Sequence, residues 1–181
     1  MRRKTLDLLL NWVGTVLTVV LIVAGVGLVI GYSFTSSQVR SQLQEQKVFF
    51  PKVGARDYQD LVKAHLTQYA GEEVLTGTQA QIFANDIIGV DTAAISGGKT
   101  YAQLSNESVS DPSNTALANQ VELVFRGDTL RGLLLNAYAF GFMGQIALYG
   151  AIAAFVLALA MLFLVLLGIR HYFQIDPEKS I

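Results

Sequence analysis

The chain has 181 residues, no cysteine, and a net charge of −1 from 13 Lys/Arg and 14 Asp/Glu. The lack of cysteine excludes disulfides, thiolate metal sites, iron–sulfur clusters and cysteine nucleophiles. The near-zero charge argues against a nucleic-acid partner, which would favour a basic excess. Apolar residues make up 52% of the chain and the mean hydropathy is +0.43, values that are high for a soluble domain and typical of a small membrane protein.

Two apolar stretches without Asp, Glu, Lys or Arg flank a polar middle, and they run from Leu8 to Phe34 and from Gly132 to Ile169. A helix needs about 20 apolar residues to cross a bilayer, and each stretch is longer than that. The sequence therefore predicts an all-α protein with two transmembrane helices and a small helical bundle between them.

The distribution of charge predicts the orientation. Arg2, Arg3 and Lys4 directly precede the first stretch, which places the N-terminus in the cytoplasm by the positive-inside rule. Two crossings return the C-terminus to the same side. Segment 35–131, with eight basic and eleven acidic residues, is then extracytoplasmic. The first stretch is too long for the apolar region of a secretory signal, and no A-x-A-like site follows it, so we expect an uncleaved anchor.

The predicted parts follow in chain order, with bounds set by these patterns. They are a cytoplasmic N-terminus over 1–5, a transmembrane helix over 6–34, an extracytoplasmic helical domain over 35–131, an extramembrane extension over 132–145, a second transmembrane helix over 146–169 and a cytoplasmic tail over 170–181.

Five helical segments are expected in the middle of the chain. The first helix continues outward, without a breaker, to Phe49–Pro51. An amphipathic helix over Asp57–Tyr69 has its apolar face at the spacing i, i+3, i+4, i+7. That face is formed by Tyr58, Leu61, Val62, His65, Leu66 and Tyr69.

Further along, a helix begins at Thr76 or Thr78 and ends at Gly97–Gly98, with Ala80, Phe83, Ala84, Ile87 and Ala94 on one side. A short helix is possible over Tyr101–Asn106. Asp111-Pro112-Ser113 then reads as the start of another helix, with Asp or Ser as its cap and Leu117, Val121 and Val124 facing inward. No β alternation of any length is present.

The second apolar stretch is longer than one crossing requires. Its 38 residues correspond to about 57 Å of helix, against a hydrocarbon core of about 30 Å. Ile146–Ile169 is the part expected in the bilayer, so Leu133–Met143 needs cover from the outer domain, the first helix or a neighbouring subunit.

Small residues mark possible helix contacts in both stretches. Gly27 and Gly31 form a G-x-x-x-G pair, the pattern that lets helices approach closely in lipid, although glycines also occur in such spans by chance. In the second stretch a seam of small residues has coiled-coil-like spacing. It consists of Ala137, Gly141, Gly144, Ala151 and Ala158.

Two amides, Asn136 and Gln145, lie within the second stretch. Such groups form interhelical hydrogen bonds worth about 0.6–2 kcal/mol in lipid. A contact with a subunit or ligand and simple hydration at the headgroups are both consistent with their positions.

No combination of residues predicts catalysis, a cofactor or a metal. His65 lies near several acidic residues but matches no ligand spacing, and with only two histidines a three-histidine site is impossible. Asp86 and Asp91 are five residues apart and do not share a helix face well. Gly97–Thr100 ends like a phosphate-binding loop, but its upstream glycine position is Ala93 and no strand precedes it.

Four segments resemble an uncharacterised family of small actinobacterial membrane proteins. They are Val39–Pro51 (VRSQLQEQKVFFP), Tyr69–Asp86 (YAGEEVLTGTQAQIFAND), Gly97–Ser105 (GGKTYAQLS) and Asp128–Phe140 (DTLRGLLLNAYAF). The resemblance implies two spans, an extracytoplasmic helical domain and the bacterial plasma membrane, and it implies no activity.

These patterns predict a non-enzymatic membrane accessory, scaffold or self-assembling protein. Its partners would be the lipid bilayer and either further copies of the chain or other membrane subunits, contacted through the Gly27/Gly31 pair, the small-residue seam and residues 133–142. An extracytoplasmic module that binds a small molecule or lipid is the alternative. A pore formed by oligomers is less consistent with two apolar stretches that carry no charge.

Overall fold

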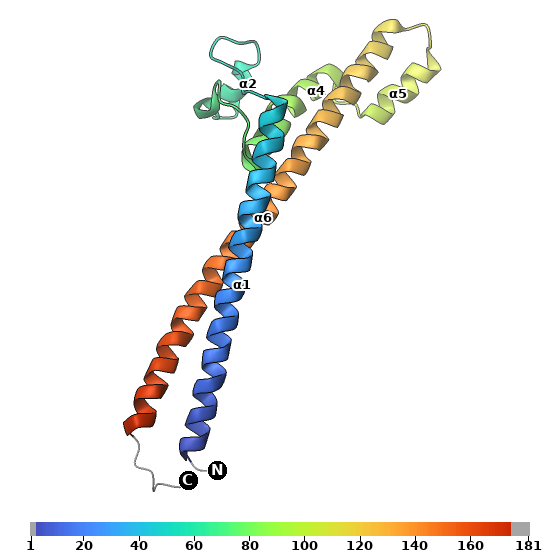
Figure 1. Ribbon diagram of the computed structural model, residues 1–181. Helices are drawn as coiled ribbons and strands as arrows, with labels where there is room; N and C mark the ends of the chain where they lie inside the picture. Colours follow the sequence, from blue (N-terminus) through green and yellow to red (C-terminus); the bar gives the residue numbers. More distant parts are fainter. Residues whose placement is uncertain (1–2, 175–181) are drawn as a thin grey trace. The chain divides into compact units, whose positions relative to one another are not determined.

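The computed structural model describes the backbone of residues 3–174 and the side chains of residues 5–174 (Figure 1). It contains no β-strand in that range, so the predicted all-α class is confirmed. The basic side chains at residues 2–4 and the predicted tail beyond residue 174 lie outside the described residues. The chain divides into two compact units, one formed by residues 1–34 with 144–181 and the other by residues 35–143.

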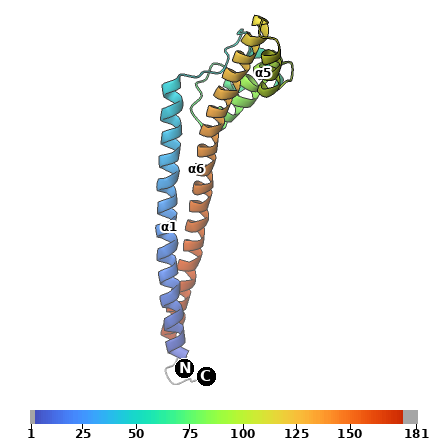
Figure 2. The same ribbon diagram turned by 90° about the vertical axis from the view of Figure 1, so that its right-hand side faces the viewer.

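Two long helices contribute to both units. Helix α1 spans Arg3–Gln46 with 44 residues, and helix α6 spans Thr115–Gln174 with 60 residues. Within the first unit the two helices run side by side in opposite directions (Figures 1 and 2). Both are long and apolar enough to cross a membrane.

The second unit adds shorter helices to the ends of α1 and α6. They are α2 (Tyr58–Lys63), the 3₁₀ helix η1 (Thr67–Tyr69), α3 (Gly77–Ile82), the π-helix η2 (Phe83–Ile88), α4 (Gly89–Ser96) and α5 (Tyr101–Ser110). A hydrophobic core joins α2, α3 and η2 to α1 and α6, and it consists of Val39, Leu43, Phe50, Leu61, Val74, Ala80, Ala84, Ile87 and Leu134. The ring of Phe50 stacks on the ring of Tyr69, with 5.2 Å between their centroids. It also makes an edge-to-face contact with the ring of Phe83, with 5.4 Å between centroids.

Helix α1 ends earlier than predicted, at Gln46 rather than near Pro51. Lys47 has a left-handed φ of 51°. The next residues then pair with a distant segment, because Phe50 N–H donates to Glu72 O at 2.8 Å and Val74 N–H to Val48 O at 2.9 Å. This antiparallel bridge places Phe50 in the core. Burial of the Phe50 side chain stabilises the fold more than three further residues of α1 would.

The predicted helix over 57–69 is also interrupted. Helix α2 stops at Lys63, and His65 adopts a left-handed φ of 56°. Leu66 N–H donates to Leu61 O at 2.8 Å, the bond that closes a Schellman motif with His65 at the position usually taken by glycine. Leu61 is buried as expected, but His65 and Val62 are exposed, which corrects their placement on the inner face.

The third predicted helix begins where expected. Gln79 N–H donates to Thr76 Oγ1 at 3.2 Å, and Thr76 N–H donates to Gln79 Oε1 at 3.1 Å, forming a capping box. Its end is also confirmed, because Gly97 has a φ of 61° and terminates α4. Ala94, however, is exposed, whereas Thr92 and Ser96 are buried.

The π-helix η2 explains this change of face. An α-helix that buries Ala80, Ala84 and Ile87 would next bury residues 91 and 94. A π-turn holds one more residue than an α-turn, so the first buried position after η2 moves one residue along the chain, from 91 to Thr92, and Ser96 follows Thr92 by one α-helical turn.

The last two helices differ at their boundaries from the prediction. Helix α5 is capped by Thr100 and Gln103 and runs on to Ser110, beyond the expected end at Asn106. Helix α6 begins at Thr115, and its cap is Asn114 rather than Asp111 or Ser113, because Leu117 N–H donates to Asn114 Oδ1 at 3.0 Å. Val124 is buried, and Leu117 and Val121 are half-buried, so the inward stripe is confirmed.

Candidate functional site

Small residues line the contact between the two helices of the first unit. A Cβ atom added to Gly14 would lie 2.8 Å from Val165 Cγ2, and one added to Gly25 would lie 2.9 Å from the ring of Phe155. On α6, a Cβ on Gly150 would lie 3.3 Å from Leu28 Cδ1. Glycine at these positions therefore allows close packing of the two helices.

The predicted seam contributes three residues to this unit, and all three are buried. Gly144, Ala151 and Ala158 follow one another at intervals of seven residues and are continued by Val165, which is also buried. This spacing is that of one position in a coiled-coil heptad. Val165 lies against Gly14 of α1, and the contact of the seam with a further subunit stays a prediction.

Gly27 and Gly31 lie on a different face of α1. Both are exposed, and a Cβ atom added to either would meet nothing within 4 Å. Gly25, two residues before the pair, is the glycine that contacts α6. A side chain added at either glycine would therefore have open space around its Cβ, and the predicted contact of the pair with another helix stays a prediction.

A second close contact joins α3 to α6 within the unit of residues 35–143. A Cβ atom on Gly77 would lie 3.1 Å from the Cα of Gly141 and 3.2 Å from Ala137 O. These two members of the predicted seam thus contact a helix of the same unit. Asn136 and Gln145 are exposed, so the predicted role of these amides in contacts stays untested.

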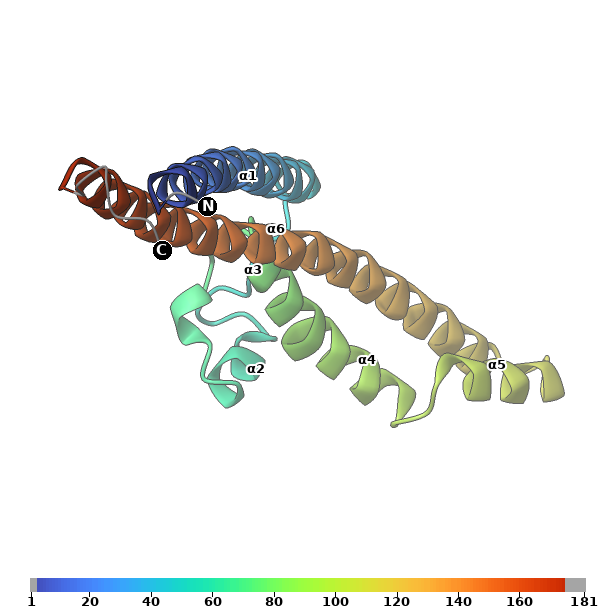
Figure 3. The same ribbon diagram turned by 90° about the horizontal axis from the view of Figure 1, so that it is seen from below.

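Helices α3, η2 and α4 run antiparallel to α6, and contacts between them continue along α6 (Figure 3). Arg131 Nη2 donates to Asn85 Oδ1 at 3.0 Å, and Thr92 packs so closely on Gly127 that a Cβ there would lie 2.3 Å from its hydroxyl oxygen. Arg131 therefore anchors the π-helix to α6.

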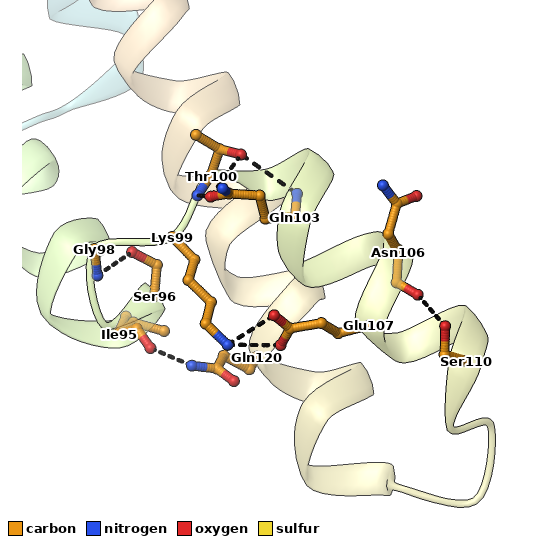
Figure 4. A network of polar contacts seen from close by, with 10 residues as sticks. All are labelled: Ile95, Ser96, Gly98, Lys99, Thr100, Gln103, Asn106, Glu107, Ser110 and Gln120. Carbon is orange, nitrogen blue, oxygen red and sulfur yellow. Dashed lines mark hydrogen bonds and ion pairs between the residues drawn. The ribbon is translucent and has the colours of Figure 1, made fainter.

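A polar network joins α4, α5 and α6 at the far end of this contact (Figure 4). Lys99 Nζ pairs with Glu107 at 2.7 Å, and Gln120 donates to the carbonyl oxygen of Ile95. About half of each charged side chain is exposed, so the ion pair adds little stability. The network fixes the α4–α5 turn and has no feature of a catalytic site.

Three carboxylates, Asp57, Asp60 and Asp91, form an acidic group between α2 and α4. Burial raises the pKa of the Asp91 carboxyl above its usual 3.8, and the charges of Asp57 and Asp60 raise it further. Arg56 opposes this effect. Ionised Asp91 therefore destabilises the folded state.

We expect Asp91→Asn to stabilise the protein at pH 7 and to have no effect well below pH 3.8, where Asp91 is protonated in the folded and unfolded states. The penalty that the substitution removes develops as the pH rises through the folded-state pKa. Since the group is partly exposed, the gain should be under about 1 kcal/mol. Thermal unfolding of the detergent-solubilised chain at both pH values measures it, with Asp86→Asn as a control outside the acidic group. A gain that is equal at both pH values would contradict this account.

The first unit contains a polar groove at the end where α1 begins and α6 ends. The groove has a volume of about 230 Å³ and is lined by Asp7, Leu10, Asn11, Gly14, Met161, Leu164, Val165, Gly168 and His171. Asp7 Oδ2 is buried and has no hydrogen-bond partner among the described residues. Asn11 lies against Gly168, where a Cβ would be 2.1 Å from Asn11 Oδ1.

Sequence analysis missed this groove, although one signal was present. Asp7 is the only acidic residue within the predicted span 6–34, and an ionisable group in a span usually has a function or a partner. Asn11 follows Asp7 by four residues and so shares its helix face. No spacing could show that His171, from the other end of the chain, lies at the same groove.

No group of three or more potential metal ligands occurs within the part of the chain that the structure describes. Comparison of the chain with protein-family models, curated proteins and solved structures finds no match.

Proposed function

We propose that the chain is an integral membrane protein with two transmembrane helices, that residues 35–131 are extracytoplasmic, and that it acts as a self-assembling or accessory subunit through helix contacts. The observation that supports this best is the exposure of its apolar helices. In the most hydrophobic window of each long helix, only 17% is buried within the structure. The core helix of a soluble protein would be mostly buried.

The exposed apolar side chains surround both helices of the first unit. Trp12, Ile30 and Phe34 on α1 are each more than 60% exposed, as are Leu159 and Phe163 on α6. Exposure of so much apolar surface to water would be costly. Lipid and neighbouring subunits are the environments that would cover it.

The second unit retains an apolar surface of its own. Leu134 is in its core, but Leu133, Phe140 and Met143 on the same stretch of α6 are about half exposed. The second unit therefore buries only one face of this part of α6. A partner helix or a second copy of the chain is the simplest cover for the other.

The alternative, an extracytoplasmic module that binds a small molecule, has less support. The centre of the second unit is filled by side chains that are 0–1% exposed, among them Phe50, Leu61 and Val74. This dense core is more consistent with a domain that presents its surface to partners.

We expect Gly27→Leu to weaken self-association about tenfold, because a side chain there would block close approach of another helix to the Gly27/Gly31 face. The contact of α1 with α6 should be unaffected, since a Cβ on Gly27 meets no atom within 4 Å. Crosslinking in native membranes and gel filtration in mild detergent measure the association. Val26→Leu enlarges an exposed residue on another face of the helix and is the control. A monomeric wild-type protein without a crosslinked partner would refute the proposal.

A further inference from the structure

The polar groove of the first unit combines an acceptor that needs a cation with walls that suit an apolar chain. Asp7 contributes a carboxylate oxygen that is buried and lacks a partner among the described residues. A buried carboxylate oxygen without a hydrogen bond is unfavourable. A positively charged donor in the groove would relieve that cost.

The other polar groups of the groove favour a small ammonium donor. Asn11 offers an amide oxygen, and Asp7 and His171 are the only titratable side chains among the lining residues. An ammonium group has three N–H donors and can bond to both a carboxylate and an amide oxygen. An imidazole can in turn donate to a phosphodiester. With a carboxylate and no Lys or Arg among the described residues that line it, the groove favours a cationic headgroup over an anionic one.

The remaining lining indicates that the ammonium belongs to an amphiphile. Leu10, Met161, Leu164 and Val165 form the apolar walls. A second groove of about 330 Å³ shares Asn11 with the first and is lined also by Leu8, Trp12, Thr15, Ile169, Tyr172 and Phe173. Tryptophan and tyrosine are enriched where a membrane protein meets the lipid headgroups.

We propose that the groove lined by Asp7, Asn11 and His171 binds the headgroup of a phospholipid with a primary ammonium, and that the apolar walls of the same groove contact the beginning of its acyl chains. Asp7 and Asn11 accept hydrogen bonds from the ammonium, and His171 lies toward the phosphate. This inference rests on the proposed insertion of the chain in a membrane.

Native mass spectrometry of the full chain in mild detergent tests the proposal. The probes are phosphatidylethanolamine, phosphatidylcholine and phosphatidylglycerol with identical acyl chains. We expect phosphatidylethanolamine to bind about tenfold more tightly than the other two, since only its headgroup donates charge-assisted hydrogen bonds. Equal binding of the three lipids would overturn the proposal.

Substitutions test whether the preference for phosphatidylethanolamine arises from the groove. Asp7→Asn should abolish it, whereas Asp7→Glu, which keeps the carboxylate, should retain most of it. Glu45→Gln removes an acidic charge from α1 in the other unit and is the matched control. Preference retained in Asp7→Asn would overturn the proposal, as would competition by soluble phosphoethanolamine at the concentration of the lipid.

Carbonate extraction of membranes that contain the chain distinguishes a failure of this inference from a failure of the proposed function. If the chain resists extraction but shows no preference among the lipids, the headgroup site is refuted and the membrane proposal stands. If the chain is extracted as a soluble protein, both are refuted.

Discussion

Gly141→Leu is expected to destabilise the unit of residues 35–143 by about 3 kcal/mol, the upper part of the usual range for overpacking. A Cβ atom at this position would lie 3.0 Å from the Cα of Gly77 and 3.4 Å from its backbone nitrogen. The obstructing atoms belong to backbone, so no side chain can rotate away to make room. Helix α3 would have to separate from α6, and the core around Ala80 and Ala84 would open with it.

The measurement is hydrogen exchange of residues 77–96 in the full chain, together with its thermal unfolding in mild detergent. Gly132→Leu is the matched control, since it introduces the same side chain on α6 where a Cβ meets nothing within 4 Å. That variant should be slightly stabilised, because leucine favours a helix more than glycine does. Equal behaviour of the two variants would show that α3 does not pack on α6 in this way.

Gly25→Leu is expected to separate α1 from α6 in the first unit. A Cβ on Gly25 would lie 2.9 Å from the ring of Phe155, and the three further carbon atoms of leucine leave the ring no space on that face. We expect a loss of about 1–3 kcal/mol of helix-pairing free energy. Gly27→Leu, two residues along, should have no such effect.

Paired cysteines in this cysteine-free chain report the contact. Leu28→Cys with Gly150→Cys places two thiols at a contact between α1 and α6, where a Cβ on Gly150 would lie 3.3 Å from Leu28 Cδ1, and a short bifunctional maleimide should join them within one chain. Adding Gly25→Leu should strongly reduce this crosslink, whereas adding Gly27→Leu should preserve it. An undiminished crosslink in the Gly25→Leu chain would rule out the observed packing.

Sequence periodicity and composition predict the helical class, the two long apolar helices and several helix ends. Thr76 and Gly97 carry local signals, a capping box and a left-handed glycine, which depend only on neighbouring residues. Such signals can be read without knowledge of the fold. The same holds for the inward stripe that ends at Val124.

Features that depend on distant residues could not be predicted in this way. The early end of α1 follows from pairing of Val48 and Phe50 with residues 72–74. The burial of Thr92 and Ser96, with Ala94 exposed, follows from a π-turn, for which no sequence pattern was available. His65 replaces the glycine expected at a helix end and so hides the end of α2.

The helix contacts, too, could be predicted from the sequence only in part. A pattern of small residues identified Ala151 and Ala158 as interface positions, but it could not show that their partner is α1 of the same chain. It also could not separate Gly25, which contacts Phe155, from Gly27, which is exposed. The groove at Asp7 and His171 joins residues from opposite ends of the chain and is visible only in the structure.

Membrane insertion with the middle of the chain on the outer side is tested most directly by labelling single cysteines. Val109→Cys introduces a thiol at a position that is 76% exposed in the second unit, and Thr5→Cys introduces one at the exposed start of α1. We expect a membrane-impermeant maleimide to label Val109→Cys in intact spheroplasts and Thr5→Cys only after permeabilisation. Labelling in the reverse order, or recovery of the chain in the soluble fraction, would contradict the account.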